Sequence, residues 1–167
     1  MTREADRYEI HETVLRYCRA VDRLDLDAVR AVYAEDGVDH HTGFSGSADD
    51  FVAWLARMLP LLDGTMHLLG NHLCEISGDQ AVAETYGTAT HWGTPATEPL
   101  MNFTSGFRYV DHFVRMPQGW RIRERFAVRE WTRDVAGRLS ASDGDGPRGR
   151  RDDQDPLATL RRRVLGS

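Results

Sequence analysis

The chain has 167 residues, of which 41% are hydrophobic and 28% are charged, and its formal net charge is -5. This length suits one domain with a core of its own. The negative charge argues against general binding to nucleic acid or to anionic membranes. No apolar run approaches the length of a membrane span, and residues 1–6 lack the apolar core of a signal peptide. Cys18 and Cys74 form no CxxC motif or disulfide framework, so we expect a cytoplasmic protein.

Apolar residues recur at helical spacing through most of the first 62 residues, which predicts a series of amphipathic helices. Asp25 is suited to cap the second helix, whose apolar face is expected to include Tyr33. Ser47, followed by Asp50 three residues later, resembles a capping box at the start of the third helix. Trp54 lies on the apolar side of that helix and is a candidate to contact a ligand. The helices are expected over residues 4–24, 26–36 and 48–62.

From residue 65 the pattern changes to that of β-strands separated by turns. The turn signals lie at residues 77–80, 93–95 and 117–119. The expected strands are 65–76, 81–92, 100–116 and 120–133, after a short extended piece at 38–42. Three helices followed by an antiparallel meander predict an α+β fold, in which the helices pack against one face of a bent antiparallel sheet.

The composition changes again beyond Val135. Residues 140–155 are rich in Gly, Asp and Arg and hold almost nothing to bury, so we expect a disordered or loosely draped segment. Residues 156–165 are compatible with a short helix that docks on another surface. The chain is therefore predicted to have one domain over residues 1–135 and a charged, partly disordered tail over residues 136–167.

Asp22 lies on the shoulder of the apolar stripe of the first helix, where a carboxylate loses hydration and needs a partner. His67 begins the first long strand and is the expected partner; strict alternation places Asn71 on the same face, toward a cavity. A carboxylate on one imidazole nitrogen fixes the tautomer and leaves the other nitrogen free as a base. The alternatives are a salt bridge from Asp22 to Arg19 or Arg23, and a strand-end histidine bonded to a loop carbonyl.

Tyr17 and Tyr33 are phenols on apolar helix faces. Such groups either pack with one hydrogen-bond acceptor or, in a pocket, donate to a carbonyl oxygen. His40 and His41 follow Asp39, which suggests a metal site. Adjacent strand residues face opposite ways, and the spacing is neither HxH nor HxxxH, so a polar edge strand without a metal is favoured. One of the two histidines is expected to face the cavity.

The last expected strand has arginines at alternating positions. Strict alternation predicts that they form a solvated face, opposite Trp120 and Ile122. A bulge between Arg125 and Arg129 would instead turn Arg129 toward the interior.

Several stretches of the sequence together resemble those of a known family. They are residues 17–25 (YCRAVDRLD), 66–71 (MHLLGN), 108–111 (RYVD) and 120–122 (WRI). Residues 150–156 (RRDDQDP) are a further similar stretch. From about Glu4 to Arg133 the chain resembles the SnoaL-like branch of the nuclear transport factor 2-like superfamily, which includes scytalone dehydratase and bile acid 7α-dehydratase. The resemblance implies a cone-shaped fold that encloses an apolar pocket, no cofactor, and a homodimer or homotrimer built on the sheet.

The resemblance also implies roles for individual residues. In the dehydratases of this group an Asp from the first helix orients a His from the sheet, and that His is the base; these roles fall on Asp22 and His67. A tyrosine five residues before the Asp matches Tyr17. An arginine of the last strand matches Arg129, which favours the bulge. The position of a second substrate-binding tyrosine falls near the His40–His41 pair.

The leading hypothesis is a cofactor-independent dehydratase that acts on a hydrophobic, polycyclic or steroid-like hydroxy-carbonyl compound. His67 would remove the proton α to the carbonyl, and Asp22 would stabilise the imidazolium. Tyr17, with Tyr33 or one histidine of the pair, would hold the carbonyl oxygen. Further substrate contacts are expected from Trp54, Asn71 and Arg129. The alternatives are a polyketide cyclase or ketosteroid-type isomerase with the same pair, and a non-catalytic ligand-binding or small-subunit assembly domain.

Overall fold

The computed structural model describes residues 3–95, 98, 100–134, 150–155, 159 and 162. The helices are α1 (Arg3–Arg23), α2 (Leu26–Ala31) and α3 (Ala48–Met58), followed by a 3-10 turn, η1 (Leu59–Leu61). The strands are β1 (Tyr33–His41), β2 (Phe44–Ser47), β3 (Gly64–Ser77), β4 (Gln80–Trp92), β5 (Phe103–Met116) and β6 (Gly119–Asp134). None of the described helices is both long enough and apolar enough to cross a membrane.

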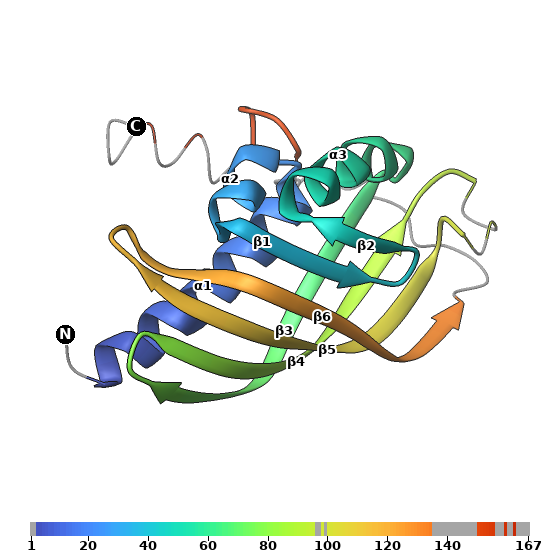
Figure 1. The fold of residues 1–167 in the computed structure, drawn as a ribbon. Coiled ribbons are helices and arrows are strands. Elements are labelled where there is room, and N and C mark those ends of the chain that lie inside the picture. The colour runs from blue at the N-terminus through green and yellow to red at the C-terminus, as the bar shows by residue number, and fades with distance from the viewer. Residues whose placement is uncertain are drawn as a thin grey trace.

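The strands form one six-stranded sheet in the order β2-β1-β6-β5-β4-β3. Neighbouring strands are antiparallel except β1 and β6, which run parallel. The sheet is strongly curved, with α1 lying along it and with α2 and α3 grouped at one end (Figure 1). The expected α+β fold, with helices packed on a bent sheet, is confirmed.

Two predicted helix caps are present. The Asp25 side chain accepts a hydrogen bond from the Ala28 amide at 3.0 Å, and the Ser47 hydroxyl accepts one from the Asp50 amide at 3.1 Å. Both caps satisfy amide groups that have no partner inside the first helical turn. The cap at Asp25 lets the chain begin α2 directly after α1, which sets the position of β1.

The predicted extent of the second helix is wrong. The helix ends at Ala31, and Tyr33 is the first residue of β1 rather than part of a helix face. The parallel pairing of β1 with β6 explains the difference, because Ile122 donates its amide hydrogen to the Val32 carbonyl at 2.9 Å. Such long-range pairing overrides local helical spacing. As a result, two strands join the expected four-stranded meander.

A bulge in β3 changes which side chains face inward. The register with β4 shifts between Leu69 and His72, so the alternation does not continue unbroken along the strand. His67 and Leu69 face the helices before the bulge, and Cys74 is buried after it. The prediction that Asn71 shares the face of His67 is therefore wrong, and Asn71 is exposed.

A bulge in β6 has a similar effect. Ile122 pairs with Phe113 and Glu124 pairs with His112, so Arg123 is the extra residue. After it, Arg125 is fully buried and the prediction of a wholly solvated arginine face is wrong at that residue. The bulge that was expected between Arg125 and Arg129 lies earlier, at Arg123. It places both residues on the inner face of the sheet, where Arg125 is buried and Arg129 is exposed.

Residues 150–155 of the predicted tail lie against the helices. The Asp155 carboxylate is buried and lies 3.5 Å from the Arg23 side chain. Residues 135–149, which hold most of the segment expected to be disordered, lie outside the described residues. The expected helix over 156–165 also lies outside them, apart from Thr159 and Arg162.

Candidate active site

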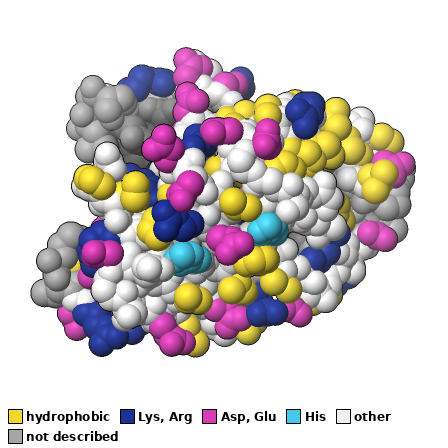
Figure 2. All heavy atoms as spheres, in the orientation of Figure 1, with side chains coloured by type: hydrophobic (Ala, Val, Ile, Leu, Met, Phe, Trp, Pro, Cys, Tyr) yellow, Lys and Arg dark blue, Asp and Glu magenta, His cyan; other side chains and the backbone are white. Residues whose placement is uncertain are grey.

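A cavity of about 420 Å³ lies between the helices and the inner face of the sheet. Its wall is mostly apolar and aromatic, and includes Trp54, Leu55, Met58, Leu62, Phe103 and Phe107. Leu61 and Leu100 line it and are well exposed, so its rim is apolar as well. Figure 2 shows hydrophobic side chains gathered on the surface at the α3 end of the molecule. A mostly apolar hollow with a few polar groups is typical of a small-molecule site.

Asp22 and His67 meet at the wall of this cavity. The His67 Nδ1 atom lies 2.6 Å from Asp22 Oδ1, and the His67 amide donates to Asp22 Oδ2 at 3.0 Å. The Thr65 hydroxyl also donates to Asp22 Oδ1 at 3.0 Å. The His67 side chain is only 7% exposed and the Asp22 side chain only 12%. Arg23, one alternative partner of Asp22, lies against Asp155 instead.

This geometry arises where α1 meets the start of β3. Asp22 lies in the last turn of α1, and its carboxylate accepts from the backbone and side chains of β3. Because Nδ1 of His67 is bound to the carboxylate, Nε2 is the nitrogen left for a ligand. A negative carboxylate also stabilises the imidazolium that forms when the histidine takes a proton. The pair is therefore suited to general-base chemistry.

Tyr17 and Tyr109 line the cavity and hold a buried arginine between them. The Arg125 guanidinium carbon lies 4.1 Å from the centre of the Tyr17 ring and 4.0 Å from that of Tyr109. Arg125 also makes two hydrogen bonds of 2.7 Å to Asp111, and both charged side chains are fully buried. Burial raises the pKa of both phenols well above 10. Each phenol therefore keeps its proton and can donate a hydrogen bond to an oxygen atom.

Of the adjacent histidines, His41 faces the cavity. Its Nδ1 atom bonds to Asp39, which is completely buried and accepts a second hydrogen bond, of 2.5 Å, from the Tyr33 hydroxyl. His40 points away and contacts the Ser45 hydroxyl at 2.7 Å. Tyr33 lies behind Asp39 and is not part of the cavity wall.

His91 was not found by sequence reasoning. It lies on β4, where its ring is 6.2 Å from that of His67 and stacks on Phe103 at 4.2 Å. Its Nδ1 atom is buried and has no hydrogen-bond partner among the described residues. Burial, and secondly the charge of His67, lower its pKa to about 4, so the ring is neutral near pH 7. The β3–β4 hairpin pairs Thr65 with His91, so knowledge of the register could have identified it.

The other expected contacts fall partly on the cavity wall and partly outside it. Trp54 and Arg129 line the cavity, and Asn71 and His40 do not. Arg125 and Asp111 were missed because the burial of Arg125 depends on the bulge at Arg123. In the part of the chain that is described, no three His, Cys, Asp or Glu side chains lie together as metal ligands would.

Comparison with known proteins agrees with this architecture. An uncharacterised protein of Mycobacterium tuberculosis is 29% identical over 128 residues, which cover 75% of this chain and 86% of that protein. A scytalone dehydratase-like protein of Novosphingobium aromaticivorans has a similar structure, with a TM-score of 0.69 and 19% identity over 83% of this chain and 93% of that one. The hexachlorocyclohexane dehydrochlorinase LinA Type2 has a TM-score of 0.75 and 16% identity over 85% of this chain and 97% of that one.

These solved structures are under 25% identical to the chain, so they show the shared fold. The family is shown by a match of sequence, because the model of the SnoaL-like domain matches residues 2–126. The chain belongs to the SnoaL-like domain family of the nuclear transport factor 2-like superfamily.

Proposed function

We propose that the chain is a cofactor-independent lyase that removes water from a hydrophobic, polycyclic or steroid-like hydroxy-carbonyl compound. The observation that supports this most directly is the contact of 2.6 Å between Asp22 and His67 at an apolar cavity of about 420 Å³. The two structural neighbours described above support it more generally. One is named as a dehydratase-like protein and the other as a dehydrochlorinase, and both names denote elimination reactions.

The proposed reaction begins with His67. Its Nε2 atom takes the proton from the carbon next to the carbonyl, and the Asp22 carboxylate stabilises the imidazolium that results. Negative charge then develops on the carbonyl oxygen. The Tyr17 phenol, which keeps its proton because burial raises its pKa, donates a hydrogen bond to that oxygen. The C–O bond to the β-hydroxyl group then breaks as the C=C bond forms, and the departing group takes back the proton that His67 removed and leaves as water.

The first prediction concerns His67 and Asp22. The purified protein is incubated with cyclic β-hydroxy ketones of two to four fused rings, and the enone is followed by its absorbance and by the loss of one water in the mass spectrum. His67→Gln is expected to lower kcat by about 10²–10⁴-fold, because it removes the base. Asp22→Asn is expected to lower kcat as well, because it removes the charge that stabilises the imidazolium.

His72→Gln is the matched control. His72 is also a β3 histidine with its Nδ1 atom in a hydrogen bond, of 2.8 Å to Thr85, but it does not line the cavity. Its variant is expected to keep full activity. Full activity of His67→Gln would overturn the proposal. A product of unchanged mass would favour the cyclase or isomerase, and no turnover with tight ligand binding would favour the non-catalytic domain.

The expected homodimer or homotrimer stays a prediction. The outer face of β3 is the surface we propose for it, because large apolar side chains are exposed there: Met66, Leu68 and Leu73. Exposed apolar side chains that lie together on one face are typical of interaction surfaces.

A further inference from the structure

A second cavity, of about 380 Å³, is lined by residues of α1, α2, the start of β6 and the segment 150–155. Within the part of the chain that is described, it shares no lining residue with the candidate active site. We propose that this cavity binds a small phosphate ester, whose phosphate is held by arginine side chains and whose organic group lies on an apolar part of the wall. This inference does not depend on the proposed lyase activity.

The positive charge of the cavity comes from three separate parts of the chain. Five arginines line it: Arg16, Arg19, Arg23, Arg121 and Arg151. The first three lie on α1 at spacings of three and four residues, so they project from one face of that helix. The others come from β6 and from the tail segment. Folding thus gathers like charges around one hollow, and an anion bound there would relieve their repulsion.

Three aspartates also line the cavity, and each of them already has a partner. Asp25 caps the start of α2. Asp152 pairs with the Arg150 side chain at 2.7 Å, and Asp155 accepts a hydrogen bond from the Arg150 amide at 2.9 Å. Asp155 also lies 3.5 Å from Arg23. These carboxylates therefore compensate only part of the positive charge around the cavity.

Three of the arginines keep most of their N–H groups available to a ligand. Arg19 makes no polar contact with any described residue. Arg121 donates to the Trp120 carbonyl through Nη1, at 3.0 Å. Arg16 lies 3.9 Å from Glu12, and its side chain is 56% exposed. A guanidinium is a planar fork that can bind two phosphate oxygens at once, so this set of side chains is suited to a doubly charged phosphate.

The apolar part of the wall suits an organic group. It consists of small side chains from α1, α2 and the residue after α2: Ala20, Ala28, Ala31 and Val32. Small side chains leave room for a flat ring beside the helices. Inorganic phosphate alone would leave this surface uncovered, so a phosphate ester fits better. The concave shape and the net charge of -5 favour a small molecule over a nucleic acid.

The test measures the binding of phenyl phosphate by isothermal titration calorimetry at low ionic strength, with inorganic phosphate and benzoate for comparison. Wild type is expected to bind phenyl phosphate more tightly than either, because only phenyl phosphate carries both the dianion and the ring. Arg19→Gln and Arg121→Gln are each expected to raise its Kd about tenfold, because each removes a charged donor. Ala31→Leu, which fills the apolar part of the cavity, is expected to weaken phenyl phosphate binding but not inorganic phosphate binding.

Two arginine variants outside this cavity are the matched controls. Arg57→Gln changes an exposed arginine of α3 that lines neither cavity, and Arg129→Gln changes an arginine that lines the candidate active site. Both are expected to leave the Kd of phenyl phosphate unchanged. A ligand that binds only the folded chain raises the temperature of unfolding, so phenyl phosphate is expected to raise Tm in wild type and less in Arg19→Gln.

The outcomes that would overturn the inference differ from those that test the lyase. Wild type that binds no phenyl phosphate would overturn it. An equal rise in Kd in Arg57→Gln would also overturn it, because the ligand would then respond to overall charge alone. A rise confined to Arg129→Gln would place the ligand in the candidate active site instead. None of these results bears on the lyase proposal, which is tested by the turnover of hydroxy ketones in His67→Gln.

Discussion

Arg125 shows how much a single buried charge matters in this fold. Its guanidinium is fully buried, makes two hydrogen bonds to Asp111, and packs against two aromatic rings of the cavity wall. Removing it leaves the Asp111 carboxylate buried without its cation. The Asp111 pKa is already raised, chiefly by burial, which indicates how poorly this position hydrates a negative charge.

Arg125→Leu is therefore expected to lower the free energy of unfolding by about 3–5 kcal/mol. Unfolding in urea, followed by circular dichroism, measures this change. The double variant Arg125→Leu/Asp111→Leu is expected to recover most of the loss, because no uncompensated charge remains buried. A double variant no more stable than the single one would mean that the ring contacts of Arg125, and not its charge, stabilise the fold.

A candidate site residue could be predicted from the sequence where its position depends on local periodicity. Asp22 was identified because it lies at the edge of a helical stripe, and His67 because it begins a strand. His91 and Arg125 were missed because their positions depend on strand register. A bulge of one residue moves every following side chain to the other face, and nothing in a single sequence marks where it falls.

At the scale of elements, residues 150–155 anchor to the helices beside the candidate site. Arg151 donates to the carbonyl oxygens of Leu62 at 2.8 Å, Leu59 at 3.1 Å and Asp22 at 3.4 Å. Its Nη2 atom also lies 3.4 Å from the hydroxyl of Thr65, which donates to the Asp22 carboxylate. One side chain of the tail thus connects the end of α1, the turn after α3 and the start of β3.

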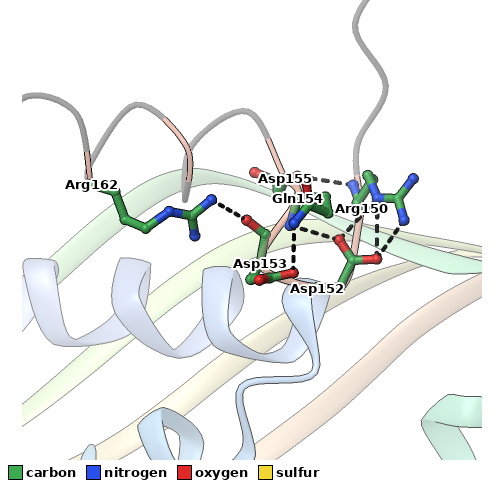
Figure 3. A network of polar contacts seen from close by, with 6 residues as sticks. All are labelled: Arg150, Asp152, Asp153, Gln154, Asp155 and Arg162. Atoms are coloured by element: carbon green, nitrogen blue, oxygen red, sulfur yellow. Dashed lines mark hydrogen bonds and ion pairs between the residues drawn. The ribbon is translucent and has the colours of Figure 1, made fainter.

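Arg151→Ala is expected to lower the free energy of unfolding by about 1–3 kcal/mol, because several acceptors lose a charged donor. It is also expected to lower kcat, because Asp22 and Thr65 lose a shared support. Arg150→Ala is the matched control. Figure 3 shows that Arg150 bonds within its own segment, to Asp152 and Asp155, so its loss is expected to leave kcat unchanged. Equal effects of the two variants on kcat would contradict a specific role for Arg151.

An element's boundary could be predicted when nearby residues determine it, and could not when a distant strand does. The Ser47 and Asp25 caps depend on neighbours three residues away and were predicted correctly. The end of α2 was not, because β1 forms by pairing with β6, about ninety positions later in the chain. The tail contacts of Arg151 were missed for the same reason, since composition alone shows a charged segment with little to bury.

At the scale of the whole molecule, His72 and His91 make the free energy of unfolding depend on pH. The fold lowers the pKa of His72 and of His91 to about 4, in both cases chiefly by burial. The folded chain therefore stays unprotonated at these rings over a pH range in which the unfolded chain, with a pKa near 6.5, binds protons. The free energy of unfolding is therefore highest, as far as these two rings are concerned, above pH 6.5, and this contribution is lost as the pH falls toward 4.

His91 alone is expected to account for about 2 kcal/mol of unfolding free energy lost between pH 7 and pH 5. His91→Phe keeps the aromatic stack on Phe103 and removes the titrating group, so the difference between urea unfolding at pH 7 and at pH 5 is expected to shrink by that amount. His112→Gln, a change at a partly exposed position on β5, controls for the loss of a histidine as such. An unchanged difference in His91→Phe would mean that water reaches the ring, and that this end of the cavity is wetter than its apolar wall implies.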